Sequence, residues 1–237
     1  MLLNASGLGA GYGAKQVIYG IDLAVAEREI VAVLGHNGAG KSTLLNALFG
    51  VIRPSAGKVA FAGADITGRK PSANVAAGLA YSLQGAEVFR TLTVTENIML
   101  GGFALRDQAA VAAKLDSIFE LFPALAERRD TRAGALSGGE RQMLSMGMQL
   151  ISSPRLIMLD EPSGGLSPLY VDRLYRAITD VQSRLGTSVL LIEQDLNHAL
   201  DIATRVYVLA NGRIVSSGPT PSDAAGVDAL RRLLVGV

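Results

Sequence analysis

The residues with the clearest chemical meaning occupy positions 35–43, which read Gly-His-Asn-Gly-Ala-Gly-Lys-Ser-Thr. They fit the pattern G-x-x-x-x-G-K-[ST], in which a glycine-rich loop wraps around phosphate groups. The three glycines allow a tight turn that aims successive backbone N–H groups at phosphate oxygens. We therefore expect Lys41 to reach the β- and γ-phosphates of a nucleotide, and Ser42 to hold Mg²⁺.

Two elements must flank this loop to hold it in place. Residues 29–34, Glu-Ile-Val-Ala-Val-Leu, form a short apolar run that is typical of a buried strand. Residues 41–49 are predicted to form a helix that Gly50 stops, with Pro54 beyond it. The N-terminus of that helix adds unpaired N–H groups and the positive end of a dipole, so the flanking elements also favour a phosphate site.

A second apolar run, Leu-Ile-Met-Leu at 156–159, ends in two adjacent carboxylates, Asp160 and Glu161. In an open parallel sheet, ligands bind beyond the carboxyl ends of the strands, so both acids should lie beside the phosphate loop. Asp160 suits Mg²⁺, directly or through its water shell, and Glu161 suits a general base that orients water. The plainer interpretation, a solvated acidic turn, is weakened by the presence of the phosphate loop.

Residues 136–140, Leu-Ser-Gly-Gly-Glu, carry a third feature. Ser137 precedes Glu140 by three residues, which is the spacing of a capping box that opens a helix, here through about Ile151. The N–H groups of such a helix N-terminus form a ready anion site. Taken alone, the segment could equally be a well-capped helix without further function.

Composition limits the class of protein. The 237 residues fit one large domain or a core with a subdomain, and 49% hydrophobic residues with a mean hydropathy of +0.31 suit a parallel sheet buried on both faces. No apolar run approaches the roughly 18 residues of a membrane-spanning helix. The net charge of +1 indicates no nucleic-acid surface, and the absence of cysteine excludes disulfides and thiol catalysis. Residues 1–5 lack the features of a secretory signal, so we expect a cytoplasmic protein.

The pattern along the chain predicts a core with an insertion. Residues 1–30 and 57–67 carry strand-like pieces separated by glycines, and Asn211-Gly212 indicates a hairpin. Helical periodicity marks residues 108–122, which Pro123 ends, and a helix that begins at Ser167-Pro168 and closes at Gly186. Further strands are expected near 79–83, 156–160 and 188–193. We predict a single domain with an α/β core of residues 1–84 and 154–237 and a helical insert at 85–153.

The order of these motifs resembles that of ATP-binding cassette (ABC) ATPases over nearly the whole chain. The matching positions are Tyr12, 35–43, Gln84, 136–142, Asp160–Glu161 and 163–167. The resemblance implies a P-loop NTPase (RecA-like) α/β core with a mainly parallel sheet, an N-terminal antiparallel β subdomain and an inserted α-helical subdomain. It also implies ATP and Mg²⁺ as ligands, and a head-to-tail dimer that binds two ATPs at its interface.

The resemblance further assigns roles to individual residues. Tyr12 is expected to stack on adenine, and Gln84 to sense the γ-phosphate and metal and to start the segment that faces a membrane subunit. Residues 137–140 would contact the ATP held by the other subunit, and residues 164–167 would cross the dimer interface. The implied catalytic residues are Glu161, Gln194 and Gln84, and the metal-binding residues are Ser42, Gln84 and Asp160. The nucleotide-binding residues are Tyr12, Gly35, His36, Asn37, Gly38, Ala39, Gly40, Lys41, Ser42, Thr43, Ser137, Gly138, Gly139 and Glu140.

Two positions depart from the family pattern. Gln194 stands where the family usually has a switch histidine, and glutamine can donate a hydrogen bond to a γ-phosphate but cannot carry positive charge. His198, four residues further on, is expected at the surface, and His36 should contribute only its backbone to the phosphate loop. Met148 stands where many relatives carry arginine, which puts a stabilising pair in doubt.

One subgroup of the family fits best. Residues 101–103, 120–123, 127–129, 132–134 and 193–194 are similar to those of ATPases from branched-chain amino acid importers, whose shorter ATPase typically has the glutamine variant. Importers of urea or short-chain amides share this architecture and are an alternative, as is a non-transport ABC ATPase. The implied partners are a second ATPase, identical or different, two membrane subunits and, indirectly, a periplasmic or extracellular solute-binding protein. The implied location is the inner face of the cell membrane.

Overall fold

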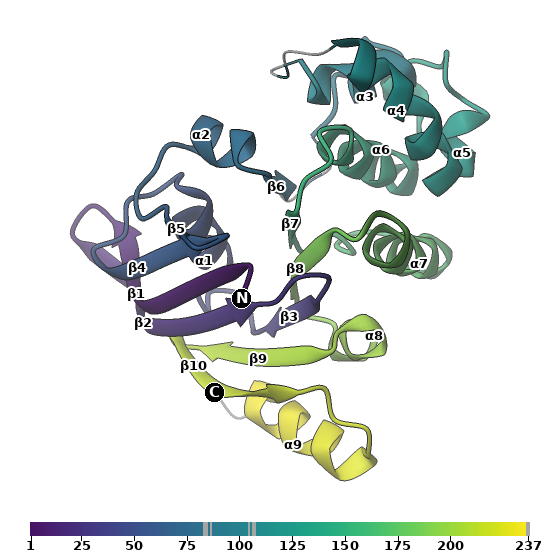
Figure 1. Ribbon diagram of the computed structural model, residues 1–237. Coiled ribbons are helices and arrows are strands. Elements are labelled where there is room, and N and C mark those ends of the chain that lie inside the picture. Colours follow the sequence, from purple (N-terminus) through teal and green to yellow (C-terminus); the bar gives the residue numbers. More distant parts are fainter. Residues whose placement is uncertain (83–84, 86, 104, 106–107, 236–237) are drawn as a thin grey trace.

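The computed structural model describes residues 1–82, 85, 87–103, 105 and 108–235, and their strands form two sheets (Figure 1). The first sheet is antiparallel, has the order β2-β1-β4-β5, and consists of β1 (Leu3–Tyr12), β2 (Lys15–Val25), β4 (Ala56–Phe61) and β5 (Ala64–Asp65). The second has the order β10-β9-β3-β8-β7-β6 and consists of β3 (Ile30–Leu34), β6 (Leu79–Ser82), β7 (Leu156–Asp160), β8 (Ser188–Glu193), β9 (Arg205–Ala210) and β10 (Arg213–Pro219).

The second sheet is parallel except for its edge strand β10. Its central strands β3, β7 and β8 are buried along their whole lengths, as their continuous apolar runs predict. Leu34 pairs with Glu193, and Asp160 pairs with Ile192. The three strands therefore end at one edge, and the residues that follow them emerge together.

Alternate side chains of the parallel strands pack into two different hydrophobic cores, as the two-residue period of a strand requires. Val31 and Val33 of β3 join the antiparallel sheet and α1 (Lys41–Phe49) in one core. Ala32 and Leu34 join helices on the opposite face, among them α7 (Pro168–Leu185) and α8 (Leu196–Ile202). Figure 1 shows the antiparallel sheet on one side of the parallel strands and these helices on the other.

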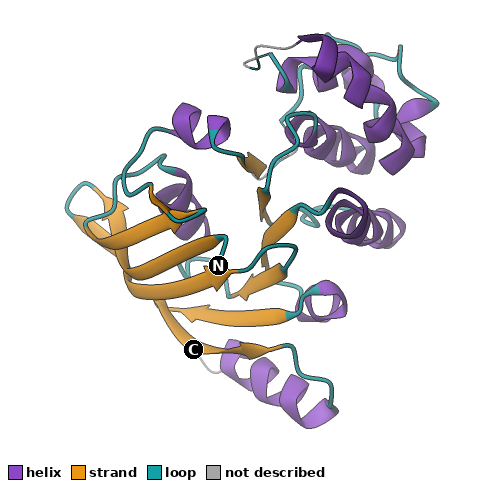
Figure 2. Ribbon diagram, in the orientation of Figure 1, coloured by secondary structure: helices purple, strands orange, loops and turns teal. Residues whose placement is uncertain are grey.

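A helical group follows β6 and precedes β7, and Figure 2 shows it projecting beyond the sheets. It comprises α3 (Val94–Gly101), α4 (Gln108–Leu121), α5 (Pro123–Ala126), the 3₁₀ helix η1 (Ala133–Ala135) and α6 (Gly138–Leu150); the remaining helices are α2 (Pro71–Ala76) and α9 (Ala224–Val235). The predicted fold class is confirmed, while the domain boundaries at 84/85 and 153/154 stay predictions. Among the described residues, no helix combines the length and apolar character needed to cross a membrane.

Two local details show where sequence signals succeed and fail. The predicted hairpin is confirmed: Asn211 and Gly212 both have positive φ, at 49° and 73°, and join the antiparallel strands β9 and β10. Gly20, by contrast, does not break its strand. It lies inside β2 with φ of 60°, where the register with β1 shifts, so the glycine accommodates an irregularity in a continuous strand.

Candidate functional site

The loop of residues 35–40 connects the end of β3 to the first turn of α1. Gly38 and Gly40 have φ of 84° and 105°, a region that side chains other than hydrogen disfavour. A Cβ at Gly40 would also lie 2.8 Å from Cγ2 of Ile18. Within the described chain, no side chain caps α1 at Gly40, so the first N–H groups of the helix are open to an anion.

Lys41 lies beneath this loop with only 4% of its side chain exposed. Its Nζ donates to the carbonyl oxygens of Gly35 at 2.7 Å and His36 at 2.9 Å, and it forms an ion pair with Oε1 of Glu161 at 2.9 Å. His36 thus contributes its backbone carbonyl here. The loop therefore positions the ammonium group, and a carboxylate from another strand end provides its counter-charge.

Asp160, the last residue of β7, is 4% exposed. Its Oδ2 accepts a hydrogen bond from the Tyr81 hydroxyl at 3.2 Å, while Oδ1 has no hydrogen-bond partner among the described residues. Burial raises the pKa of Asp160 above its ordinary value and outweighs the opposing effects of Ser42 and Tyr81. A buried carboxylate oxygen with unused acceptor capacity is the kind of group that a cation would complete.

Glu161 and Gln194 meet at the edge of the sheet. Gln194 follows β8, and its Nε2 donates to Oε2 of Glu161 at 2.8 Å and to Oδ1 of Asn37 at 2.9 Å. Glu161 has φ of 46°, and its N–H donates to the carbonyl of Ile192 at 2.9 Å. The amide of Gln194 thus links the phosphate loop to the carboxylate of Glu161. The backbone of Glu161 is held in the left-handed region, which residues other than glycine seldom adopt.

These groups surround a cavity of about 260 Å³. Its lining combines open backbone at the loop with a lysine, two hydroxyls and a carboxylate, and comprises Val17, Asn37, Gly38, Gly40, Lys41, Ser42, Thr43 and Glu161. Tyr12, at the end of β1, is half exposed, and its hydroxyl accepts from Nδ2 of Asn46 on α1 at 3.2 Å. The chemistry of the lining suits a polyphosphate, and the half-exposed ring of Tyr12 is held beside α1 by its hydrogen bond to Asn46.

The 136–140 segment forms the predicted capping box. The Ser137 hydroxyl accepts from the Glu140 N–H at 3.2 Å, and the Glu140 carboxylate accepts from the Ser137 N–H at 2.7 Å. A Cβ at Gly139 would collide with the ring of Tyr170, whereas Gly138 borders open space. Figure 1 shows α6 in the helical group, apart from α1, so one chain does not bring this motif to its own phosphate loop.

Gln84 falls outside the described residues. Two other positions that the sequence singled out lie away from the cluster. His198 is a third exposed; it is hydrogen bonded to Asp195 at 2.8 Å and stacks on Tyr175 on the α7 side. Met148 is 8% exposed and belongs to the core that includes the helical group.

Two contributors to the site were not predicted from the sequence. Tyr81 bonds Asp160 from the adjacent strand β6, and Glu193 lies buried directly before Gln194. Parallel pairing of β6 with β7 puts Tyr81 opposite Met158, so its hydroxyl reaches Asp160 two residues further along β7. The chain separates Tyr81 and Asp160 by 79 residues, so no local pattern reveals the contact. A carboxylate in an apolar strand, as in Leu-Leu-Ile-Glu at 190–193, was the available signal for Glu193.

The buried carboxylate of Asp160 should make the free energy of unfolding depend on pH. Because folding raises its pKa, the native state holds the proton more tightly than the unfolded state, and stability falls as pH rises from near 3.8 through the raised value. Asp160→Asn removes this loss. We expect the variant to gain stability relative to the wild type over that range and to keep its advantage above it, as measured by urea unfolding without nucleotide or Mg²⁺.

Asp65→Asn is the control, because its carboxyl group should make stability change with pH in the opposite direction. Hydrogen bonds from Thr67 lower the pKa of Asp65, so its carboxylate stabilises the fold above the unfolded value, and this contribution disappears as pH falls. A stability difference between Asp160→Asn and the wild type that does not vary with pH would contradict the prediction.

Comparisons with known proteins agree with this geometry. Residues 18–164 match the family model described as ABC transporter. The chain is 43% identical to the high-affinity branched-chain amino acid transport ATP-binding protein BraG of Pseudomonas aeruginosa, over 86% of this chain and 87% of that protein. It is 34% identical to the probable branched-chain amino acid transport ATP-binding protein LivF of Archaeoglobus fulgidus, covering 100% and 99%. It is also 33% identical to the lipopolysaccharide export system ATP-binding protein LptB of Haemophilus influenzae, covering 99% and 97%.

Solved structures show the same fold. The ADP conformation of MJ1267, an ATP-binding cassette of an ABC transporter, superposes with a TM-score of 0.83 at 24% identity, covering 98% of this chain and 94% of that one. The dimeric, post-hydrolysis cassette MJ0796 bound to ADP and phosphate superposes with a TM-score of 0.78 at 18% identity, covering 93% and 100%. On the strength of the family model and these relatives, the chain belongs to the ABC transporter family and is an ATP-hydrolysing transport ATPase.

Proposed function

We propose that this chain powers the import of branched-chain or other hydrophobic amino acids by binding and hydrolysing ATP. The cluster of Lys41, Glu161, Gln194 and Asn37 supports the catalytic part of the proposal. The solute class is supported by the 43% identity to BraG, against 33% for the exporter component LptB. Urea and short-chain amides remain the alternative solutes.

Lys41 and Glu161 suggest how ATP enters the site. The ion pair between them is the contact that an arriving γ-phosphate would replace, because the phosphate is also an anion and Lys41 is held under the loop by two carbonyls. Glu161 would keep its bond to Gln194 and become able to accept a proton from the attacking water. The ring of Tyr12 would stack on the adenine.

The residues present fit Mg²⁺. Asp160 offers a buried oxygen without a hydrogen-bond partner among the described residues. The Ser42 hydroxyl lies close enough to lower the pKa of the same carboxylate. Oxygen ligands of this kind are those that Mg²⁺ prefers. Asp160 and Ser42 would hold the ion, and Gln84, the third expected metal residue, lies outside the described part of the chain. When bound, the ion would neutralise charge on the β- and γ-phosphates.

A second ATPase subunit would complete the site. The N-terminus of α6 carries a satisfied capping box and an open Gly138, which suits an anion, yet it lies apart from the phosphate loop of its own chain. We propose a head-to-tail dimer, in which Ser137, Gly138 and Gly139 contact the ATP held by the partner. The structurally similar cassette MJ0796 is dimeric, which is consistent with this arrangement.

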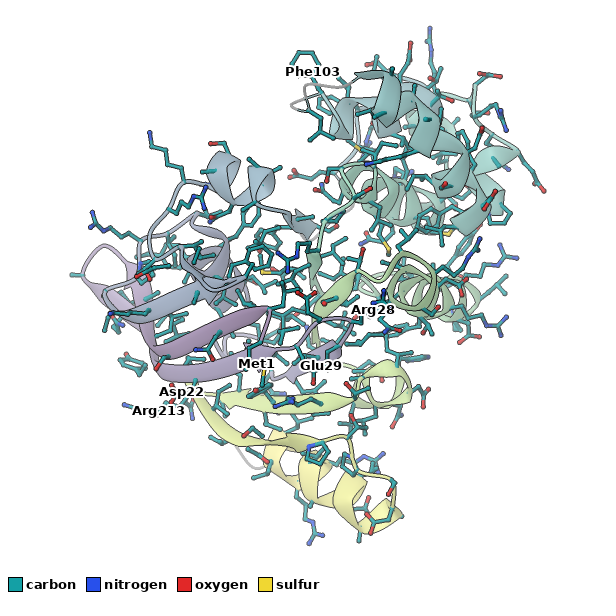
Figure 3. All side chains as sticks on the ribbon, viewed as in Figure 1. Met1, Asp22, Arg28, Glu29, Phe103 and Arg213 are labelled. Carbon is teal, nitrogen blue, oxygen red and sulfur yellow. The ribbon has the colours of Figure 1, made fainter. Side chains whose placement is uncertain are left out.

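The segment after Gln84 would dock a membrane subunit at the inner face of the cell membrane. A groove of about 540 Å³ lies here, lined by Tyr81, Gly85, Glu87, Val88, Phe89, Arg90, Ser145, Met148 and Gln149. The ring of Phe89 is 55% exposed, although its backbone N–H and C=O are both bonded to the buried Asn97 side chain. Phe103, 78% exposed, lies at the outer tip of the helical group (Figure 3). These rings are apolar surface that a partner would cover.

Glu161→Gln tests the catalytic assignment. We expect ATP turnover to fall by roughly 10²–10⁴-fold, because the amide cannot accept the proton of the attacking water. ATP should still bind, since the substitution removes the competing anion from Lys41. Single-turnover hydrolysis measures the first effect, and gel filtration with ATP should show a closed dimer. Near-normal turnover by the folded variant would rule out Glu161 as the base.

Phe89→Asp tests the docking surface. We expect it to weaken association with the transporter's membrane subunits at least about tenfold, because a charge replaces apolar contact area. ATP binding and the melting temperature should stay at wild-type values. Val51→Asp, at a residue of 54% exposure on the nucleotide-binding core, is the control. Co-purification after coexpression provides the measurement, and equal loss in both variants would contradict the proposed surface.

Uptake assays test the solute class. Cells that carry Lys41→Ala in place of the wild-type chain should lose ATP-dependent uptake of labelled leucine, isoleucine and valine, because the lysine that binds phosphate is gone. Urea uptake and lipopolysaccharide export should be unaffected. Loss of either of those processes with normal leucine uptake would replace amino acid import by the corresponding alternative.

A further inference from the structure

Glu193 is a buried carboxylate that the proposed chemistry does not use. It is the last residue of β8, is 2% exposed, and does not line the cavity at the phosphate loop. Burial raises its pKa, whereas hydrogen bonds from the backbone N–H groups of Ser163 and Gln194 oppose that shift. Burial of a carboxylate is unfavourable unless it is hydrogen bonded, so the groups that hydrogen bond to Glu193 indicate its role.

The two oxygens of Glu193 hold two different loops. Oε1 accepts from the backbone N–H of Ser163 at 3.2 Å, and Oε2 accepts from the backbone N–H of Gln194 at 3.2 Å. Ser163 lies two residues after Glu161, in the loop that follows β7. One side chain therefore bridges the loop that carries Glu161 and the loop that carries Gln194.

Packing fixes the carboxylate from the opposite side. Tyr175 of α7 is 5% exposed and adjoins Glu193, whose charge adds to burial in raising the pKa of the phenol. The Tyr175 ring stacks on His198 with centroids 5.2 Å apart, and Asp195, which bonds His198, caps the N-terminus of α8. Glu193 thus adjoins α7 through Tyr175, the residue whose ring contacts α8.

The bridge requires an ionised carboxylate. Such a group only accepts hydrogen bonds, and here each oxygen meets an N–H donor. A glutamine has the same shape but one acceptor oxygen, so its NH₂ group would face one of the two backbone donors. One loop would then be released, and Glu161 sits in a left-handed backbone conformation that depends on its surroundings.

We propose that Glu193 is a positioning residue. By bridging their two loops, it holds Glu161 and Gln194 in the relative positions that ATP hydrolysis requires. The proposal rests on the role of Glu161 as the base. The proposal goes beyond that role because it states that a residue outside the cavity sets the position of the base. Misplacement of a reacting group by about 1 Å can cost up to 10²-fold in rate, so a loosened bridge should reduce catalysis without removing any group that binds ATP.

The test compares Glu193→Gln with Glu29→Gln. Glu29 is also a largely buried carboxylate that accepts two hydrogen bonds, from Ala26 N–H at 2.6 Å and Arg205 Nε at 2.9 Å, but it lies before β3, at the opposite end of that strand from the site (Figure 3). We expect Glu193→Gln in the full chain to lower the single-turnover rate about tenfold with the Kd for MgATP within twofold. Glu29→Gln should lower the melting temperature while leaving the rate unchanged.

A double variant separates positioning from general loss of structure. In a Glu161→Gln background, Glu193→Gln should change the residual rate less than twofold, because there is no base left to position. The same tenfold loss in both backgrounds, or an equal loss for Glu29→Gln, would overturn the proposal. If Glu193→Gln does not fold, Glu193→Asp provides the measurement, with a smaller rate loss expected and an unchanged rate counting against the bridge. Normal turnover by Glu161→Gln alone would instead refute the proposed function.

Discussion

Parallel pairing of β3, β7 and β8 is the constraint on which the site depends. The three strands are buried on both faces, and their register brings Leu34 level with Glu193 and Asp160 level with Ile192. Residues from distant parts of the chain, such as Gly35 and Glu161, then leave the sheet at one edge. A slip of a single residue would turn each strand's side chains to the opposite core and would separate the groups around the phosphate loop.

That edge concentrates charge in a buried place. Lys41, Asp160 and Glu193 are each at most 4% exposed, and burial of an ion costs several kcal/mol unless partners offset it. Lys41 is compensated by two carbonyls and by Glu161, and Glu193 by the N–H groups of two loops. Asp160 is the least compensated, with one oxygen unbonded within the described chain. Perturbed pKa values of this kind gather where a protein binds ligands or performs catalysis.

The helical group carries the surfaces that we propose contact partner proteins. Two capping boxes, at Thr93–Glu96 and Ser137–Glu140, fix where α3 and α6 begin. The buried Asn97 side chain bonds the backbone of Phe89 and so holds an exposed aromatic ring in a defined place. The groups proposed to meet partners are thus set by local hydrogen bonds, whereas the nucleotide cluster is set by the sheet.

The sequence by itself determined the elements and the family. Strand-like apolar runs, the glycine-rich loop, the acid pair at 160–161 and the helix-opening motif at 136–140 are local patterns, and local patterns report backbone preference directly. The tertiary structure alone decided which side chains meet. It paired Lys41 with Glu161, placed Gln194 between Glu161 and Asn37, and brought Tyr81 to Asp160. It also made Glu193 a bridge between two loops, because contacts across 30 to 157 residues depend on strand order and register, which no short stretch of sequence encodes.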